Sequence, residues 1–253
     1  MALTNSNIVY MSVNPYFLRK TEGVFMEIIE GIHRVDEASA NMAHANVYLL
    51  INGEELTVVD TGTSGNAKKI VEYIQKIGHR PTDVKTIILT HYHLDHMGSA
   101  KELKDLTNAR VAVHADDADY VSGKKPYPKP KNLLYRAVSP FIKLVPVEVD
   151  VILKEGDKIA GLTVFHMPGH TPGSIMLLDE QRKVLFSSDT LRYDGEKVSG
   201  ASEGFSADLD QMRESIAKAS KLNFDIMLPG HGETLKPKAS EEIKKFNETL
   251  KQQ

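Results

Sequence analysis

The stretch TIILTHYHLDHMGS, Thr86 to Ser99, places three histidines and an aspartate within six residues at the end of an apolar run. The apolar run predicts a short buried strand. In extended backbone residues i and i+2 share a face, so His91 and His93 can bind one ion. Asp95 and His96, one turn further on, can face a second ion. Because four such groups would repel or desolvate one another without a cation, the stretch predicts a metal site and not a solvated polar loop.

Three later polar clusters occur in matching contexts, each directly after a predicted strand. Their sequences are MPGHTPGS, FSSDT and LPGHGE, at residues 167–174, 186–190 and 228–233. The flanking Gly and Pro residues shape turns that let a short side chain reach inward. Each cluster contributes one candidate ligand: His170, Asp189 and His231. With the first stretch they complete a set of seven nitrogen and oxygen ligands with one central carboxylate.

Composition narrows the classes of protein. The chain has 253 residues, 41% of them hydrophobic, which is enough for one α/β domain with a substantial core. A net charge of −3 gives no global basic field, so nucleic acid stays open as a partner but is not favoured. Without cysteine, a metal site must use nitrogen and oxygen ligands. No stretch approaches the about 20 apolar residues of a membrane span, and the first residues lack a signal-peptide pattern, so we expect no membrane contact and a cytoplasmic protein.

Hydrophobic periodicity predicts strands in groups. In the first half we expect strands at 24–35, 46–51, 55–59, 86–89 and 110–114, and helices at 67–77 and 99–106. In the second half we expect strands at 147–153, 162–166, 174–178, 184–187 and 225–228. Two further helices are predicted: 207–220, with Ser206 as N-cap, and 237–251, with Pro237 in its first turn. This order favours two packed sheets flanked by helices over a doubly wound parallel sheet.

The order of the motifs resembles that of a known family. THYHLDH, GHTPGS, SSDT and PGHG follow one another, and VVDTG precedes them at Val58–Gly62. This pattern is similar to that of the metallo-β-lactamase superfamily of hydrolases from about residue 24 to 253. The resemblance implies an α+β fold, a four-layer αβ/βα sandwich with a dinuclear metal site at one edge of the sheets. It also implies a single domain over 24–253, preceded by an N-terminal extension at 1–23.

The resemblance assigns a role to each ligand candidate. It implies one ion held by three histidines: His91, His93 and His170. It implies a second ion held by a mixed set: Asp95, His96 and His231. Asp189 would bridge the two ions, and Asp60 matches the buried aspartate that supports the site without binding metal. Two divalent ions are therefore expected, with zinc as the default and iron or manganese as alternatives.

The expected chemistry follows from two cations roughly 3.5–4 Å apart, which share a water, lower its pKa and leave hydroxide as the nucleophile. The arrangement looks similar to the glyoxalase II and lactonase branches, which implies attack on an ester, thioester, lactone or related carbonyl. Asp189 is present and cysteine is absent, which counts against a dedicated β-lactamase, although promiscuous β-lactamase activity stays open. A phosphodiesterase or nuclease using the same site is the main alternative. A mononuclear-iron oxygenase is a further one.

Two other features bear on the substrate. The segment 122–148, SGKKPYPKPKNLLYRAVSPFIKLVPVE, interleaves lysines with aromatic residues. It is either a lid that meets an anionic or partly apolar small molecule, or a connector whose apolar half packs on the body or on a second subunit. A homodimer therefore stays open. Tyr193, four residues after Asp189, either reaches the site as a catalytic residue together with Asp95 and Asp189 or lies in a surface loop.

Overall fold

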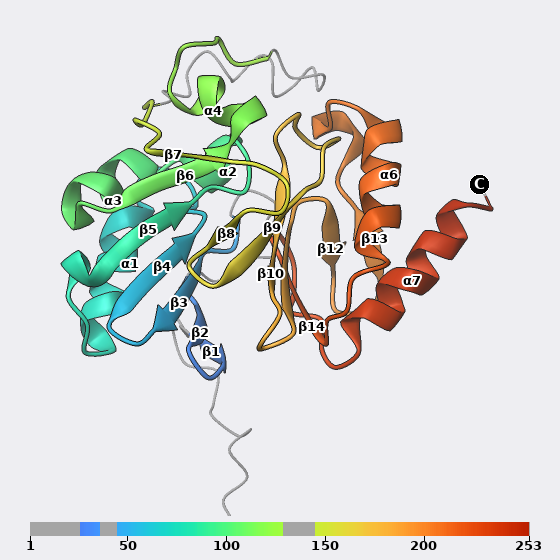
Figure 1. Cartoon of the computed structure of the whole chain (residues 1–253), viewed down its shortest axis with the longest axis horizontal. Coiled ribbons are helices and arrows are strands. Elements are labelled where there is room, and N and C mark those ends of the chain that lie inside the picture. The colour runs from blue at the N-terminus through green and yellow to red at the C-terminus, as the bar shows by residue number, and fades with distance from the viewer. Residues whose placement is uncertain (1–25, 36–44, 129–144, 253) are drawn as a thin grey trace, which may run out of the picture.

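The protein is described by a computed structural model that covers residues 26–35, 45–128 and 145–252. Two β-sheets pack face to face, with a layer of helices outside each (Figure 1). The first sheet runs in chain order: β1 (Met26–Ile29), β2 (Ile32–Arg34), β3 (Tyr48–Asn52), β4 (Glu55–Val59), β5 (Val84–Ile88), β6 (Arg110–His114) and β7 (Val151–Leu153). The order in the second sheet is β14 (Ile226–Pro229), β11 (Val184–Ser188), β10 (Ile175–Asp179), β9 (Leu162–His166) and β8 (Lys158–Ile159). This is the four-layer αβ/βα sandwich expected from the sequence.

The helices divide between the two outer faces. On the first sheet lie α1 (Asn66–Lys76), α3 (Ala100–Thr107) and α4 (Ala115–Val121). On the second lie α6 (Leu209–Ala219) and α7 (Ala239–Leu250), beside a hairpin of β12 (Leu191–Tyr193) and β13 (Val198–Gly200). The single-turn helix α2 (Leu94–Met97) follows β5. Among the described helices, none combines the length and apolar character that crossing a bilayer requires.

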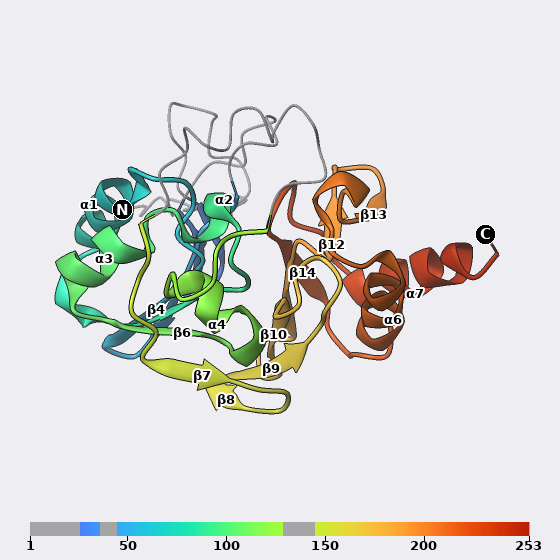
Figure 2. The ribbon, with the colours of Figure 1, turned by 90° about the horizontal axis from the view of Figure 1, so that it is seen from above.

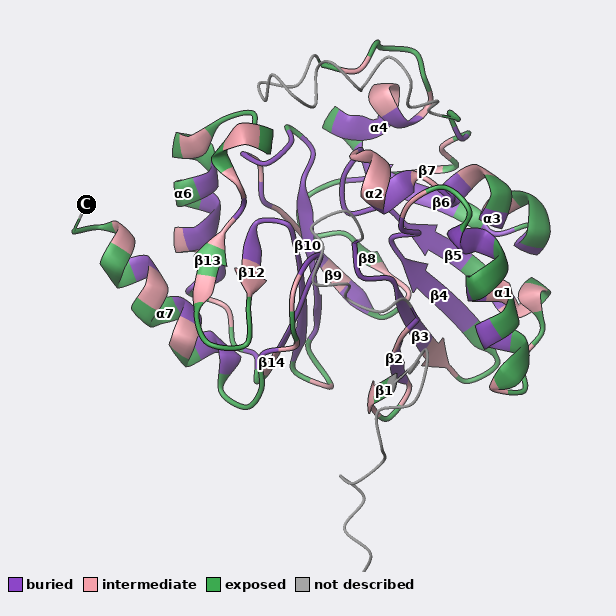
Figure 3. Ribbon diagram, turned by 180° about the vertical axis from the view of Figure 1, so that it is seen from behind, coloured by how far each residue is buried: buried purple, intermediate pink, exposed green. Residues whose placement is uncertain are grey.

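Alternation along the strands separates the three core layers. In β3, Tyr48 and Leu50 face the core between the two sheets, whereas Leu49 packs under α1 and α3. In β10, Leu177 faces the same central layer and Met176 packs under α6 and α7. Figure 3 shows buried residues gathered on the strands and exposed ones on the outer sides of the helices. A side-chain period of two therefore fixes which face each strand presents.

The carboxyl ends of several strands meet at one edge of the sandwich. The parallel neighbours β4 and β5 end together in the first sheet, and β11 and β14 end together in the second. Each of these strands is followed by one of the motif segments, and β9 leads into the segment with His170. Seen from above, α2 and α4 lie at this edge (Figure 2). The topology therefore brings motifs far apart in sequence to one place.

Some predicted boundaries were wrong. Ser206 does not cap α6, because Asp208 accepts hydrogen bonds from the backbone nitrogens of Asp210 and Gln211. Pro237 is not in the first turn of α7, which begins at Ala239. The predicted strand at 147–153 is a strand only over its last three residues, since the side chain of Asp150 takes the hydrogen bond from Val111 N. The extension at 1–23 and residues 129–144 of the segment 122–148 lie outside the described residues.

Candidate metal centre

All seven predicted ligands meet at the edge where the strands end. They form three overlapping groups, within each of which the candidate ligand atoms lie no more than 4.8 Å apart: His91, His93 and His170; His91, His96 and Asp189; Asp95, His96 and His231. The imidazole rings are close neighbours, with centroids of His91 and His96 only 4.0 Å apart. The sequence therefore identified side chains from four separate segments that the fold brings into one cluster.

Buried nitrogens in the cluster lack a protein partner. Within the described residues, Nε2 of His91 and Nε2 of His170 are buried and accept or donate no hydrogen bond. Burial holds the pKa of both rings well below the usual value, and loss of solvent around His93 lowers its pKa to about 4. These imidazoles are therefore neutral, which is the state that binds a metal ion. The donor set fits a divalent cation such as zinc, because unpartnered buried nitrogen is otherwise costly.

Asp189 lies between the two groups of ligands. Its Oδ1 is 3.3 Å from His96 Nε2, and its Oδ2 is 3.5 Å from His170 Nε2 and 3.6 Å from His231 Nε2. Burial raises the pKa of Asp189, but the charges of Arg192, His231 and His96 outweigh it and hold the pKa well below the usual value. An ionised carboxylate that lies within 3.6 Å of histidines from both ligand groups suits the predicted bridge.

The second group carries charge of both signs. Asp95 Oδ2 lies 3.0 Å from His231 Nε2, and about 29% of the Asp95 side chain is exposed. Burial raises the pKa of Asp95, but the charge on His96 and a hydrogen bond from His231 outweigh it and lower the pKa to about 2. Burial likewise lowers the pKa of His96, yet Asp60, Asp189 and Asp95 together raise it well above the usual value. The carboxylates in this half of the cluster thus favour groups or ions that carry positive charge.

Asp60 supports the cluster through hydrogen bonds to residues of the first motif. Its Oδ1 accepts a hydrogen bond from Thr90 N, and its Oδ2 accepts one from Thr90 Oγ1 and lies 2.8 Å from His96 Nδ1. On the other sheet, Ser188 Oγ donates to Thr90 Oγ1 at 2.9 Å. Asp60 and Ser188 both adopt left-handed backbone, with φ of 58° and 53°, which costs a non-glycine residue about 1–2 kcal/mol. The surrounding hydrogen bonds offset this strain and fix His96.

Close packing explains a glycine in the last motif. A Cβ added at Gly230 would meet Asp189 Oδ1 and would lie 2.8 Å from His96 Cε1. Gly230 also bonds to both halves of the sandwich: its nitrogen donates to Ser188 O in β11, and its carbonyl accepts from Asn46 N just before β3, each at 2.7 Å. The turn therefore approaches the cluster more closely than any residue with a side chain could.

Tyr193 lies elsewhere. Its hydroxyl donates to Gly195 O at 2.7 Å, and its ring packs with the apolar layer beneath α6 and α7. It also lines a groove together with Leu235 and Phe246 on that side of the second sheet. The structure does not place the Tyr193 side chain in the histidine cluster, because β12 turns it toward the helices. We therefore assign it no catalytic role.

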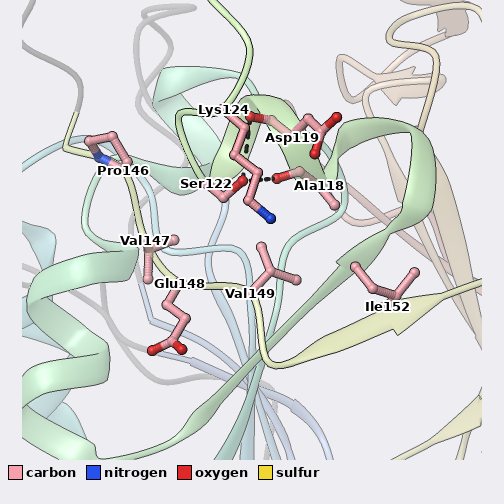
Figure 4. Close-up of a pocket in the computed structure, with 9 residues that line it drawn as sticks. All are labelled: Ala118, Asp119, Ser122, Lys124, Pro146, Val147, Glu148, Val149 and Ile152. Atoms are coloured by element: carbon pink, nitrogen blue, oxygen red, sulfur yellow. Dashed lines mark hydrogen bonds between the residues drawn. The ribbon is translucent and has the colours of Figure 1, made fainter.

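The described ends of the segment 122–148 lie side by side at the end of α4, where Val147 N donates to Val121 O and Gly123 lies against Pro146. Tyr127 Oη donates to Tyr92 O at 2.6 Å, which joins this segment to the loop that carries the first histidines. Lys124 lines a pocket beside α4 with parts of the chain around 146–149 (Figure 4). Among the residues that line this pocket, none is a candidate metal ligand. The pocket and the metal cluster are therefore separate features.

A further group of two histidines and an aspartate is not built like a metal site. The rings of His114 and His166 stack with centroids 3.9 Å apart and an interplanar angle of 15°, beside Asp116. Parallel stacked rings cannot both direct their in-plane lone pairs at one ion. His114 Nδ1 accepts from Asp116 N, and His166 Nε2 lies 2.8 Å from Pro172 O. This group instead fixes the start of α4 against β9.

Sequence reasoning missed two charged residues at the cluster. Arg192 Nη2 forms an ion pair with Oδ2 of Asp189, which lies three residues earlier in the chain. Asp117, on α4, is fully buried and bonds to two ligand-bearing loops. The spacing of Arg192 from Asp189 was a usable signal, because the two residues are only three positions apart in the chain. Asp117 gave none, since its partners lie 25 to 56 residues away in the chain.

Comparisons with known proteins agree with this architecture. The sequence profile of the Metallo-beta-lactamase superfamily matches residues 41–231. The chain is 28% identical over 231 residues to the probable metallo-hydrolase YflN of Bacillus subtilis (strain 168), covering 83% of this chain and 87% of that protein. It is 32% identical over 179 residues to the human acyl-coenzyme A thioesterase MBLAC2, covering 61% of this chain but only 60% of that protein.

A solved structure supports the fold alone. The metallo-beta-lactamase family protein TTHA1429 from Thermus thermophilus matches with a TM-score of 0.69 at 20% identity, over 89% of this chain and 81% of that one. The sandwich and the His/Asp cluster at its edge together define a metal-binding hydrolase. Within that class, the chain belongs to the metallo-β-lactamase superfamily.

Proposed function

We propose that the protein is a dinuclear metal-dependent hydrolase that cleaves an ester, thioester, lactone or related carbonyl bond in a small molecule. The observation that carries this proposal is the placement of Asp189, whose carboxylate lies between the two groups of candidate ligands, within 3.6 Å of His170 on one side and of His96 and His231 on the other. Around it lie buried imidazole nitrogens that form no hydrogen bond with the described part of the chain. A single ion would leave part of this donor set unused, whereas two ions would use all of it.

The proposal gives each residue a task. His91, His93 and His170 would hold one ion, and Asp95, His96 and His231 the other, with Asp189 between them. When bound, two divalent ions supply an acidified water near neutral pH and polarise the carbonyl of the substrate. Zinc is the first choice, with iron and manganese as alternatives for the same ligands.

Two carboxylates would act in the reaction itself. Asp189 would orient the attacking water, since it lies at the centre of the cluster and is fully buried. Asp95 is the acidic ligand candidate with a partly exposed side chain, which suits it to accept a proton from an incoming water. Arg192 would hold the charge of Asp189 in place through their ion pair. No serine or cysteine nucleophile is required.

A carbonyl substrate is favoured over a phosphodiester. The support is the similarity to MBLAC2, a protein named as an acyl-coenzyme A thioesterase, at 32% identity. The same cluster could also activate water against a phosphodiester, so this reaction is the alternative to be tested. The net charge of −3 gives no broad attraction for nucleic acid, which agrees with a small-molecule substrate.

The test is a substrate screen with the zinc-loaded protein. The panel is an acyl-coenzyme A thioester, a lactone, a β-lactam and bis(p-nitrophenyl) phosphate, each assayed before and after metal removal. We expect the highest kcat/KM on the thioester or the lactone, and its loss in the stripped protein and in His93→Ala. The matched control is His79→Ala, a histidine that belongs to none of the metal-ligand groups. Fastest turnover of the phosphodiester would overturn the carbonyl assignment.

A further inference from the structure

Asp117 is a buried carboxylate that the proposed reaction does not use. It lies in the first turn of α4 and is fully buried. Three donors surround it: Tyr92 N lies 3.1 Å from Oδ2, Thr171 Oγ1 lies 2.7 Å from Oδ2, and Gly173 N lies 2.7 Å from Oδ1. All three distances are those of hydrogen bonds to an acceptor. The carboxylate is therefore fully engaged by protein groups.

These donors belong to the two loops that carry one group of histidines. Tyr92 stands between His91 and His93, and Thr171 directly follows His170. The loops come from different sheets, after β5 and after β9. Asp117 is thus a direct link between the two segments whose histidines form the three-histidine group. Its bonds fix the distance between those segments.

Asp117 lies in close contact with the loop after β9. The helix α4, which carries Asp117, is itself fixed by further contacts. A Cβ added at Gly173 would lie 2.6 Å from Asp117 Cγ, so the loop rests directly on the carboxyl group. The start of α4 is fixed by His114, which accepts from Asp116 N and stacks on His166 of β9. Asp117 therefore bonds to the loops from a rigid base. Rigid supporting partners of this kind set the orientation of metal ligands.

Burial makes the ionised form of Asp117 energetically unfavourable. It raises the pKa of Asp117 to about 7, and the hydrogen bonds from Thr171, Gly173 and Tyr92 only partly oppose the rise. Its hydrogen bonds to both loops are therefore explained by what they position, the segments that carry His91, His93 and His170.

We propose that Asp117 is a positioning residue that sets how tightly His91, His93 and His170 hold their metal ion. The ion at Asp95, His96 and His231 depends on other supports, chiefly Asp60. This inference rests on the proposed assignment of two ions. It predicts a selective effect: losing the Asp117 bonds weakens one ion and leaves the other almost unchanged.

The test measures zinc affinity by competition with a chelator, in proteins that keep only one ion. His231→Ala disables the second position, and His93→Ala disables the first. Asp117→Asn keeps the size but turns an amide NH2 group toward one of the backbone N–H donors. In the His231→Ala background we expect Asp117→Asn to weaken zinc by roughly 10–100-fold. In the His93→Ala background we expect little change.

Two further variants complete the design. Asp119→Asn is the matched control, because Asp119 is on the same helix but pairs with Lys125 at the surface. It should leave zinc affinity unchanged in both backgrounds. Thr171→Val removes one bond to Asp117 and should weaken the first ion less than Asp117→Asn does. If Asp117→Asn does not fold, as judged by circular dichroism, Thr171→Val carries the test.

The outcomes separate the inference from the proposed function. Equal losses in both backgrounds, or no loss in either, would overturn the role of Asp117. A wild-type protein that binds no zinc would instead overturn the proposed function itself. Selective loss in the His231→Ala background would support both.

Discussion

Asp189 is the residue on which both halves of the cluster depend. It is buried, yet Arg192, His231 and His96 keep its pKa well below the usual value, so it is ionised. A buried carboxylate of this kind is stable only because positive charge surrounds it. The same property makes it suited to join two cations, whose mutual repulsion its charge would offset.

Replacing Asp189 by asparagine should weaken the binding of the second of the two proposed ions. Asparagine keeps the shape but is neutral and has one good ligating oxygen, so the second ion should be held less tightly. We expect Asp189→Asn to keep the fold, to bind closer to one metal than two per chain, and to lose most of its turnover. Metal analysis and a kinetic assay check this. Two tightly bound ions with wild-type turnover would require another bridging carboxylate.

Asp117 should make the stability of the metal-free protein depend on pH. Burial raises its pKa to about 7 from an ordinary value of 3.8, so the folded state binds a proton more tightly than the unfolded state. The contribution of Asp117 to the free energy of unfolding is complete below about pH 4 and decreases as the pH rises toward 7. The slope approaches about 1.4 kcal/mol per pH unit. Denaturant unfolding of wild type and Asp117→Asn should therefore diverge over this window, and parallel curves would contradict the raised pKa.

The residues that meet in the His/Asp cluster were predictable from sequence, but the residues that support them were not. His91, His93 and Asp95 lie within one short stretch, and their spacing alone indicates a metal site. Arg192 and Asp117 act through contacts that only the folded chain creates. Tyr193 was a candidate because it follows Asp189 closely, yet the strand it belongs to turns it toward α7. Proximity in sequence does not fix the direction of a side chain.

Tight turns at strand ends are the elements that shape the site. The turn after β14 brings Gly230 against Asp189 and His96, and the loop after β9 brings Gly173 against Asp117. In both places backbone takes the space that a side chain would fill. The elements behind these turns are buried strands, which hold the turns in fixed positions.

Gly230→Ala should damage the site more than the fold. The added Cβ would meet Asp189 and His96, and overpacking of this kind costs about 1–3 kcal/mol. We expect weaker metal binding and reduced turnover, with a folded protein by circular dichroism. Gly204→Ala is the matched control, because a Cβ there has nothing within 4 Å. Equal effects of the two substitutions would show that the close approach of Gly230 does not matter.

Sequence patterns located most strands but not the ends of several elements. The strands β3 and β4 were predicted to within about two residues at their ends, because the two faces of each strand are buried in different layers. The helix α4 was not predicted, since its first turn carries acidic residues whose role is to bond to other segments. The start of α6 was misplaced because two residues near it, Ser206 and Asp208, are both suitable caps, and only Asp208 makes the bonds.

The two sheets place their ligands on opposite sides of one edge. The first contributes His91, His93, Asp95 and His96, and the second contributes His170, Asp189 and His231. Metal ions would therefore join the two halves of the sandwich. Because such ions bind only the folded chain, their binding free energy adds to the free energy of unfolding.

Removing metal should lower the melting temperature. At a free zinc concentration of about 100 times Kd, one ion adds about 2.7 kcal/mol of stability. For a chain of this size that corresponds to roughly 5–11 °C. We expect a chelator to lower the melting temperature by at least this amount and zinc to restore it. In His93→Ala the shift should be smaller, and a melting temperature unaffected by the chelator would argue against ions between the sheets.

A zinc titration of the metal-free protein tests whether hydrolysis requires two metal ions per chain. At each step, bound zinc per chain and hydrolysis of the substrate preferred in the screen are measured on the same sample. We expect no turnover in the stripped protein and a rate that reaches its maximum only at two zinc ions per chain. Full turnover without metal, or a maximum reached at one ion, would contradict a dinuclear hydrolase.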